Sequence, residues 1–365
     1  MNRKITVLDL FAGAGGFTAS FHEASDRFET VCAVELDQAA AASYEATFGN
    51  GIVYAGDIKT WLSREVVPSV DVIIGGPPCQ GFSRLGKQDA EDSRNFLWHE
   101  YARTIRKAEP KFFVVENVAE FRRSQQYRQF EAETKKGGML QAYDFESAIL
   151  NAADFGAAQS RRRTVIIGYH RDLGRPGMPM PTHSADPERT GLKPHVTVAE
   201  AFRRVPRWPD RDSVLAYRWT SFQGREFAGA FRARELHWSR TYTDLSLRRF
   251  AVIPPGGNRR NLERYPDLMS PCWTKHKNGS LDVMGRLHWD RPAVTIRTEF
   301  FKPEKGRYLH PEEDRAITHY EAALLQGFGR DHRFVGSKIE IARQIGNAVP
   351  IPLGAAIGRL LVDHL

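Results

Sequence analysis

The sequence predicts an α/β fold, in which a doubly wound, mostly parallel sheet is accompanied by a smaller second domain. Two observations support this. The first half of the chain alternates short apolar runs with helical patterns, and this alternation stops near Arg171. Repeated β-α-β units favour a parallel sheet with helices on both faces. The length of 365 residues is sufficient for two domains and a sizeable buried core.

The individual elements follow from the periodicity of the apolar residues. Short apolar runs predict buried strands at 5–11, 30–36, 51–55, 70–75, 111–116, 143–150 and 163–169. The patterns between them predict helices at 16–26, 38–48, 61–66 and 95–108. Regular structure returns at 316–326 and in a closing helix at 351–365.

A change of character divides the chain. Residues 174–194 are rich in proline, glycine and polar residues, which is typical of a linker. Between 193 and 288 the periodicity is poor, and aromatic residues alternate with arginines. We therefore expect a first domain at 1–175, a small domain at 176–320 whose variable part is about 193–288, and a segment at 321–365 that returns to the first domain.

Composition excludes little. Lysine and arginine outnumber aspartate and glutamate by 52 to 44, and this modest excess indicates a polyanionic partner only weakly. The three cysteines, Cys32, Cys79 and Cys272, form no CxxC pair, so neither a metal site nor a disulfide framework is expected. The residues at 1–4 run straight into the first predicted strand, so we expect no signal peptide, and no apolar run reaches the roughly 18 residues of a membrane span. A reduced, cytoplasmic protein is expected.

A glycine-rich turn follows the first predicted strand, in the segment DLFAGAGGF at 9–17. Such a turn lets the backbone approach a ligand closely, although an ordinary strand–helix turn has the same appearance. Glu35 and Asp57 end the next two strands, where open α/β sheets bind ligands. The pattern is GxGG, and neither GxGxxG nor a P-loop is present. An adenosine cofactor without a pyrophosphate is therefore favoured over a dinucleotide.

The segment GGPPCQGFS at 75–83 places Cys79 just past the end of the fourth strand. A cysteine is more often a small core residue than a nucleophile, and Cys32 within an apolar run fits that interpretation. Cys79 does not, because prolines precede it and small or polar residues follow it. Its position at the same sheet edge as the cofactor groups predicts a nucleophile.

Charged residues also end the following strands. Glu116 directly follows an apolar run, so it is either a strand-end carboxylate bonded to backbone or a catalytic group beside Cys79. The segment QSRRR at 159–163 lies in the loop before the last predicted strand. One interpretation is a solvated basic face, which alternation along a strand makes plausible for Arg162. Arg161 and Arg163 share the opposite face and could reach an anionic or carbonyl group together.

At this point the chain resembles the DNA (cytosine-5)-methyltransferase family, of the prokaryotic type. The resemblance runs nearly end to end, because the motifs occur in order at sensible spacing. They are DLFAGAGGF, Glu35, GDI at 56–58, GGPPCQGFS, ENV at 116–118, QSRRR at 159–163, RPAVT at 291–295 and QIGNAVP at 344–350. The resemblance implies a large catalytic domain that faces a small target-recognition domain across a DNA cleft.

The resemblance also implies roles for the matched positions. S-adenosylmethionine would be held by the following residues: Phe11, Gly13, Gly15, Gly16, Glu35, Asp57, Ile58, Pro77, Asn347 and Ala348. Pro77 to Gln80 would form the active-site loop, and Gln80 and Ser83 would contact DNA. In the variable region, Arg259 and Arg260 are candidates for base readout.

The chemistry explains why these residue types are needed. C5 of cytosine is a poor nucleophile, and addition of the Cys79 thiolate to C6 activates it. A protonated carboxyl at Glu116 would bond N3 and the exocyclic amine, Arg163 would bond the O2 carbonyl, and Arg161 would orient Glu116. These groups reach the base only if it is flipped out of the duplex.

Two other functions compete. A tRNA cytosine-5 methyltransferase would share the fold and the chemistry, although the GFS segment after Gln80 and the long variable region favour DNA. A catalytically inactive module that binds DNA or cofactor is the second, and intact Cys79 and Glu116 argue against it. We expect a monomer, with duplex DNA as partner, that modifies DNA in a restriction-modification system. A cognate endonuclease would act on the same site without direct contact.

Overall fold

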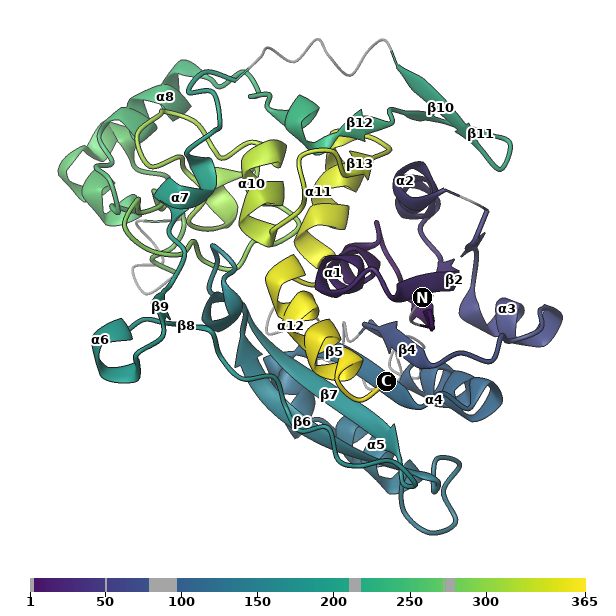
Figure 1. Ribbon diagram of the computed structural model, residues 1–365. Helices are drawn as coiled ribbons and strands as arrows, with labels where there is room; N and C mark the ends of the chain where they lie inside the picture. The colour runs from purple at the N-terminus through teal and green to yellow at the C-terminus, as the bar shows by residue number, and fades with distance from the viewer. Residues whose placement is uncertain (1–2, 50, 79–96, 210–217, 272, 274–279) are drawn as a thin grey trace. The chain divides into compact units, whose positions relative to one another are not determined.

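A sheet of seven strands organises the first of two units into which the described part of the chain divides (Figure 1). The structure is a computed structural model that describes residues 3–49, 51–78, 97–209, 218–271, 273 and 280–365. The first unit comprises Met1–Phe155, Arg162–Thr182 and Ala348–Leu365. The second comprises Gly156–Arg161 and His183–Asn347.

The strand order in this sheet is β3-β2-β1-β4-β5-β7-β6. The first five strands pair in parallel, whereas β7 pairs antiparallel with both β5 and β6. The bounds are β1 Ile5–Leu10, β2 Phe28–Glu35, β3 Val53–Ala55, β4 Val72–Gly75, β5 Phe112–Val118, β6 Tyr143–Asn151 and β7 Arg162–His170. The predicted α/β class with a mostly parallel sheet is thereby confirmed.

Helices cover both faces of this sheet (Figure 1). They are α1 Gly16–Ala24, α2 Gln38–Phe48, α3 Ile58–Arg64, α4 Leu97–Ala108, α5 Gln125–Glu133 and α12 Ile351–Val362, with 3₁₀ turns at Ala119–Arg123 and Ala152–Phe155. On one face α1 packs against α12, and a side chain at Gly354 would collide with Ser20. On the other face Trp61, Tyr101 and Phe130 pack against the sheet, so the sheet lies between two helical layers.

Aromatic packing explains one feature of the central strands. Phe113 on β5 lies directly opposite Gly168 on β7, and its ring covers that glycine so closely that a side chain there would overlap it. Phe113 is fully buried and packs against Phe130 and Tyr143. Burial of a phenylalanine contributes about 2–3 kcal/mol, so this contact helps to hold the antiparallel strand in register.

The second unit consists of short elements. They are β8 His183–Ser184, α6 Pro187–Thr190, β9 Lys193–Pro194, α7 Val198–Phe202, β10 Trp219–Phe222, β11 Arg225–Ala228, β12 Phe231–Arg232, α8 Asp244–Ala251, α10 His319–Gln326, β13 Arg333–Phe334 and α11 Lys338–Asn347. Short 3₁₀ helices lie at Ala233–Leu236, Arg259–Arg264, Pro266–Leu268 and Pro303–Lys305. The poor periodicity of 193–288 reflects elements too short to repeat an apolar pattern.

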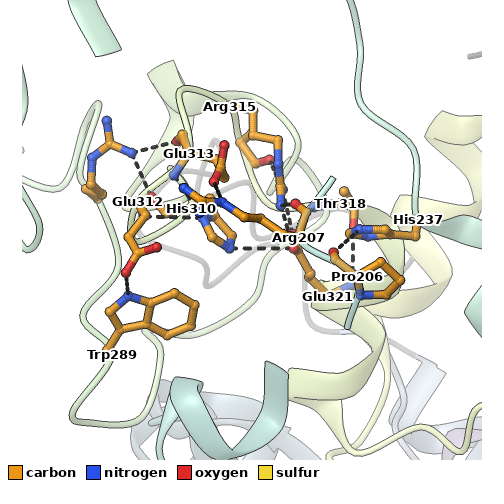
Figure 2. Close-up of polar contacts among 12 residues, drawn as sticks. Pro206, Arg207, His237, Trp289, His310, Glu312, Glu313, Arg315, Thr318 and Glu321 are labelled. Atoms are coloured by element: carbon orange, nitrogen blue, oxygen red, sulfur yellow. Dashed lines mark hydrogen bonds and ion pairs between the residues drawn. The ribbon is translucent and has the colours of Figure 1, made fainter. Parts of the chain in front are cut away.

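Polar contacts hold these short elements together. The Arg286 side chain is almost fully buried and donates to four backbone carbonyls, those of Ile253, His310, Glu313 and Phe250. Nearby, Arg315 makes two hydrogen bonds of 2.8 Å to Glu321 (Figure 2). Such contacts supply backbone partners that regular sheet ladders would otherwise provide.

Local capping decides several helix boundaries. Helix α10 begins at His319, later than the predicted 316, because Thr318 and Glu321 form a capping box. Helix α3 begins at Ile58, earlier than the predicted 61, because Asp57 caps it. Among the described residues, no single helix has the length and apolar character needed to cross a membrane; α11 and α12 meet that test only when they are taken as a pair.

Candidate active site

The turn after β1 has the backbone conformation that its glycines predict. Gly13 and Gly15 have φ angles of 56° and 83°, in the left-handed region that favours glycine. Phe11 also has a positive φ, 57°, which is uncommon for a side chain of this size. A Cβ added at Gly13 would meet no heavy atom within 4 Å. The turn therefore presents backbone to open space.

Glu35 ties this turn to the end of β2. Its Oε2 accepts a hydrogen bond of 2.8 Å from the Gly13 amide, and its Oε1 accepts one of 2.7 Å from the Asp37 amide. Burial raises the pKa of Glu35, while the two amide bonds act in the opposite direction. Each carboxylate oxygen has a second lone pair, so Glu35 can still accept hydrogen bonds from hydroxyl groups of a ligand.

Asp57 lies at the end of β3 and caps helix α3. Its Oδ1 accepts from the amides of Lys59 at 2.8 Å and Thr60 at 3.2 Å. Both bonds use Oδ1, so they leave the acceptor capacity of Oδ2 for another donor. Ile58, the first residue of α3, is 3% exposed and belongs to the core beneath the sheet.

The C-terminal segment contributes to the same turn. A Cβ added at Gly16 would lie 3.1 Å from the Cβ of Ala348, so only a glycine allows this approach without displacement. Ala348 belongs to the first unit and stands just before helix α12. Asn347 ends helix α11 and is the last residue of the second unit.

Asp9 is a residue whose importance the sequence did not reveal beyond its place in the motif. It is 1% exposed, its Oδ2 accepts 2.7 Å from the Thr18 hydroxyl, and its Oδ1 has no partner among the described residues. Burial raises its pKa to about 7, against the opposing effect of Thr18. Only the fold shows that this carboxyl lies beneath the glycine turn and is cut off from water.

A second group of residues lies where β4 and β5 end. The Asn117 side-chain amide donates 2.9 Å to the Pro77 carbonyl, and its Oδ1 accepts from the Val118 amide. Gly76 lies beside Glu116, since an added Cβ would be 3.5 Å from Glu116 Oε2. Asn117, which sequence reasoning assigned to no role, thus anchors the segment that enters the 75–83 loop. Its place within the ENV motif was the available signal.

Glu116 and Arg163 form a partly buried ion pair. Arg163 Nε lies 2.9 Å from Glu116 Oε1, and the two side chains are 14% and 9% exposed. Arg163 also donates to the Arg162 carbonyl. Arg161 belongs to the second unit, is 3% exposed and donates 2.9 Å to the Ile296 carbonyl.

Some predicted site residues fall outside the part of the chain that the structure describes. They are Cys79, Gln80 and Ser83, and Cys272 lies outside it as well. Cys32 is partly buried, and burial raises the pKa of its thiol to about 11, which fits the core interpretation of that cysteine.

The predicted readout pair lies at the start of a 3₁₀ helix. Asn258 caps this helix, and its Oδ1 accepts 2.9 Å from the Arg260 amide. Arg259 is buried at 8% exposure, whereas Arg260 is exposed. Of the two, only the Arg260 side chain lies at the surface in this conformation.

Two kinds of chemistry are therefore combined in the first unit. Acceptor groups and an open glycine turn stand at the ends of β1, β2 and β3. A carboxyl–guanidinium pair and an anchored loop stand at the ends of β4 and β5. The first set suits a polar ligand with hydroxyl and amine groups, and the second suits a planar group that both accepts and donates hydrogen bonds.

Comparison with known proteins agrees with this geometry. The sequence profile of the C-5 cytosine-specific DNA methylases matches residues 5–363. The chain is 31% identical to the type II methyltransferase M1.HphI of Haemophilus parahaemolyticus, over 98% of this chain and 87% of that protein. It is 32% identical to M.NgoFVII of Neisseria gonorrhoeae, over 96% and 84% of the two chains.

Solved structures show the same fold. A putative DNA modification methyltransferase encoded within an E. coli prophage superposes with a TM-score of 0.71, at 23% identity and 99% coverage of both chains. The S. pombe Dnmt2 methyltransferase gives 0.57 at 15% identity, again with 99% coverage of both. The family match favours DNA methylation over the tRNA-modifying and inactive alternatives. The chain belongs to the C-5 cytosine-specific DNA methylase family and is a DNA (cytosine-5)-methyltransferase, in a family that takes its methyl group from S-adenosylmethionine.

Proposed function

We propose that this enzyme methylates C5 of a flipped-out cytosine within a specific duplex sequence, through a covalent bond between Cys79 and C6 of the base. The observation that carries the proposal is the Glu116–Arg163 pair, which stands beside the loop segment anchored by Asn117. The chain connects the anchored Pro77 to Cys79 through a single residue. A base-binding pair next to a nucleophile is the arrangement that this addition requires.

The cofactor would be held at the ends of β1, β2 and β3. The open space at Gly13 and the remaining lone pairs of Glu35 and Asp57 fit an adenosine with a short charged tail. Phe11, Gly15, Gly16, Ile58, Pro77, Asn347 and Ala348 complete the proposed set. When bound there, S-adenosylmethionine supplies an electrophilic methyl group.

Glu116 and Arg163 would prepare the base for addition. A proton on Glu116 would be shared with N3, which draws electrons from the C5–C6 bond, and Arg163 would stabilise charge on O2. The Cys79 thiolate then bonds to C6, and the electron pair of the double bond becomes available at C5. After methylation a base removes the C5 proton, and the returning electron pair expels the thiolate. Arg161 would support this arrangement as a positioning residue.

The second unit would carry target recognition. Extrusion of the base costs a few kcal/mol, which contacts with the surrounding duplex must offset. Gln80 and Ser83 would contact DNA beside the active site, and Arg260 is exposed for a base or phosphate contact. The proposed division is a catalytic domain at 1–175, a recognition domain at 176–320 and a returning segment at 321–365. Arg259 would need to move to reach DNA.

The curated relatives are type II methyltransferases, which supports a role in a restriction-modification system. The enzyme would act as a monomer on cytoplasmic DNA, and an endonuclease would recognise the same site without contact.

Bisulfite sequencing of DNA from expressing cells first identifies the target position. The test then uses duplexes that contain 5-fluorocytosine at that position. Fluorine cannot leave C5 as a cation, so the Cys79–C6 bond formed with the wild-type enzyme should persist through denaturation. We expect the crosslink to need S-adenosylmethionine for full yield and to map to Cys79 by peptide mass spectrometry. Cys79→Ala should abolish it, while Cys32→Ala, the matched control, should retain it.

Glu116→Gln should form the same crosslink far more slowly, because the nucleophile remains while N3 activation is impaired. A crosslink that maps to another cysteine, or methylation by Cys79→Ala, would overturn the proposed mechanism.

A further inference from the structure

A chain of buried hydroxyl groups starts at Asp9 and runs beneath the glycine turn that follows β1. Asp9 Oδ2 accepts a hydrogen bond of 2.7 Å from the Thr18 hydroxyl on α1, and that hydroxyl lies 2.8 Å from the Tyr44 hydroxyl on α2. Asp9 is 1% exposed, and Thr18 and Tyr44 are fully buried. All three belong to the first unit, and the proposed chemistry assigns none of them a role.

The protons of this chain have one orientation while Asp9 is ionised. A hydroxyl group has a single proton, and Thr18 donates it to the carboxylate, so Thr18 accepts from Tyr44. A proton on Asp9 Oδ2 would oppose the donation from Thr18. A proton on Oδ1 would meet no acceptor, because Oδ1 is buried and has no hydrogen-bond partner among the described residues. The ionised carboxyl is therefore the form that this chain fits.

The far end of the chain supports the turn itself. Gly15, whose φ is 83°, stands just before α1, and a Cβ built there would lie 3.0 Å from Tyr44 Cδ2. The Tyr44 ring thus packs close to the backbone of Gly15, while Thr18 lies in the first turn of the helix that follows. The chain connects β1, α1 and α2 around the turn whose backbone is open at Gly13, so a rearrangement of its hydrogen bonds would move that turn.

The titratable groups that interact with Asp9 are Glu35 on β2, Tyr44 on α2 and Tyr101 on α4. Burial raises the pKa of Asp9 to about 7, the hydrogen bonds with Thr18 oppose this, and the nearby Glu35 adds to it. Burial also raises the pKa of Tyr44 and of Tyr101 well above 10, so both phenols keep their protons near neutral pH. The carboxyl of Asp9 therefore changes its charge near neutrality, while its two phenol neighbours do not.

From this geometry we infer that Asp9 is a positioning residue for the cofactor: its carboxylate, through Thr18 and Tyr44, holds the glycine turn in the conformation that binds S-adenosylmethionine. The inference rests on the cofactor site proposed above and adds to it a group that does not touch the ligand. Because binding then favours the ionised carboxyl, cofactor affinity should be complete above pH 7 and should decrease as the pH falls through 7.

Titration calorimetry of the full chain with S-adenosylmethionine, between about pH 6 and about pH 8, measures this dependence. Asp9→Asn keeps an oxygen for Thr18 but cannot ionise, so it resembles the protonated wild type. For a coupling of about fivefold, the lower end of what is usual between two sites, the ratio of wild-type to Asp9→Asn affinity should rise about threefold over this range. Thr18→Val breaks the chain and should weaken binding near pH 8, whereas Thr18→Ser keeps the hydroxyl and should bind as tightly as the wild type.

Asp71→Asn is the matched control. Asp71 is 5% exposed and accepts from a threonine hydroxyl, as Asp9 does, but it directly precedes β4 at the opposite end of the sheet. Burial would raise the pKa of Asp71, but hydrogen bonds from Thr6 and Lys111 outweigh it and lower the value, so this carboxyl stays ionised over the range. The ratio of wild-type to Asp71→Asn affinity should therefore not change with pH.

Other groups that titrate in this range are common to the proteins compared. Burial raises the pKa of Glu35, but Glu35 is present in every variant, and the amino group of the cofactor titrates equally in all experiments. S-adenosylhomocysteine, which lacks the sulfonium charge, should give the same rise in the ratio. A rise confined to S-adenosylmethionine would mean that Asp9 acts through its charge, and would overturn the positioning role.

A ratio of wild-type to Asp9→Asn affinity that does not change with pH would refute the inference and leave the cofactor site intact. If Asp9→Asn does not fold, the Thr18 variants decide, because equal affinities of Thr18→Val and Thr18→Ser would refute it as well. A wild-type enzyme that bound neither ligand would show that the proposed cofactor site itself is wrong, and the inference would fall with it.

Discussion

His310 makes the second unit sensitive to acid in a way that a single substitution can isolate. Its Nδ1 accepts hydrogen bonds from the amides of Glu312 at 3.2 Å and Glu313 at 3.0 Å (Figure 2). A proton on Nδ1 would break both bonds. Burial is the main cause that lowers the pKa of His310 to about 4. Arg315, Arg286 and His237 act in the same direction, whereas Glu321 opposes them.

The sign and size of the effect follow from linkage. Because the unfolded chain binds the proton near pH 6.5 and the folded one only near 4, the stabilising contribution is complete above 6.5 and is lost as the pH falls towards 4. Between pH 7 and pH 5 this loss amounts to about 2 kcal/mol for His310. Buried His319, with its pKa also lowered to about 4 by burial, adds a loss of similar size.

Substitution of His310 by asparagine tests this reasoning, since the amide oxygen keeps an acceptor near the two backbone amides but cannot titrate. We expect the loss of unfolding free energy between pH 7 and pH 5 to be about 2 kcal/mol smaller in His310→Asn than in the wild type. Urea unfolding followed by tryptophan fluorescence measures it, and Trp289 reports directly because its ring lies 5.3 Å from that of His310. His364→Asn, at an exposed histidine, is the control.

The pH dependence of stability must be compared between His310→Asn and the wild type, because a single pH profile contains contributions from several groups. In the first unit burial raises the pKa of Asp9 to about 7, so its contribution is retained at low pH and decreases as the pH rises through 7. That term opposes the histidines but is common to both proteins. If His310→Asn retains the full wild-type pH dependence, the assignment of acid sensitivity to His310 is refuted.

Two further predictions concern the first unit. Asp57→Ala removes the cap of α3, which should cost about 1 kcal/mol of stability. Calorimetry should show weaker S-adenosylmethionine binding by this variant, while its DNA affinity stays constant. Unchanged cofactor affinity would contradict the assignment of Asp57 to the cofactor site. Asn117→Ala loses the hydrogen bond to the Pro77 carbonyl, worth about 1 kcal/mol, and should slow single-turnover methyl transfer about fivefold without altering cofactor affinity. A wild-type rate in this variant would show that the anchor has no effect on the loop.

Much of the first unit could be predicted from the sequence because each of its strands is defined by residues that are adjacent along the chain. Each apolar run is long enough to define a strand, and the strand-end residues Glu35, Asp57 and Glu116 follow directly from those runs. Helix α5 was not predicted, because only Gln126 and Phe130 of its nine residues are buried and its pattern is weak. The second unit has few runs of this kind, so its pairing of β12 with β13 was not accessible.

The sequence by itself determined the fold class, the order of the strand-end motifs and the family, since each depends on residues close together along the chain. Only the tertiary structure decided which side chains meet: Arg163 with Glu116, Asn117 with Pro77, and Arg232 beside Arg333. It also decided that Asp9 and Arg259 are buried. The physical reason is that burial and pairing depend on contacts between segments far apart in the sequence. A local sequence pattern does not indicate which distant segment will pack over a given charged side chain and exclude water from it.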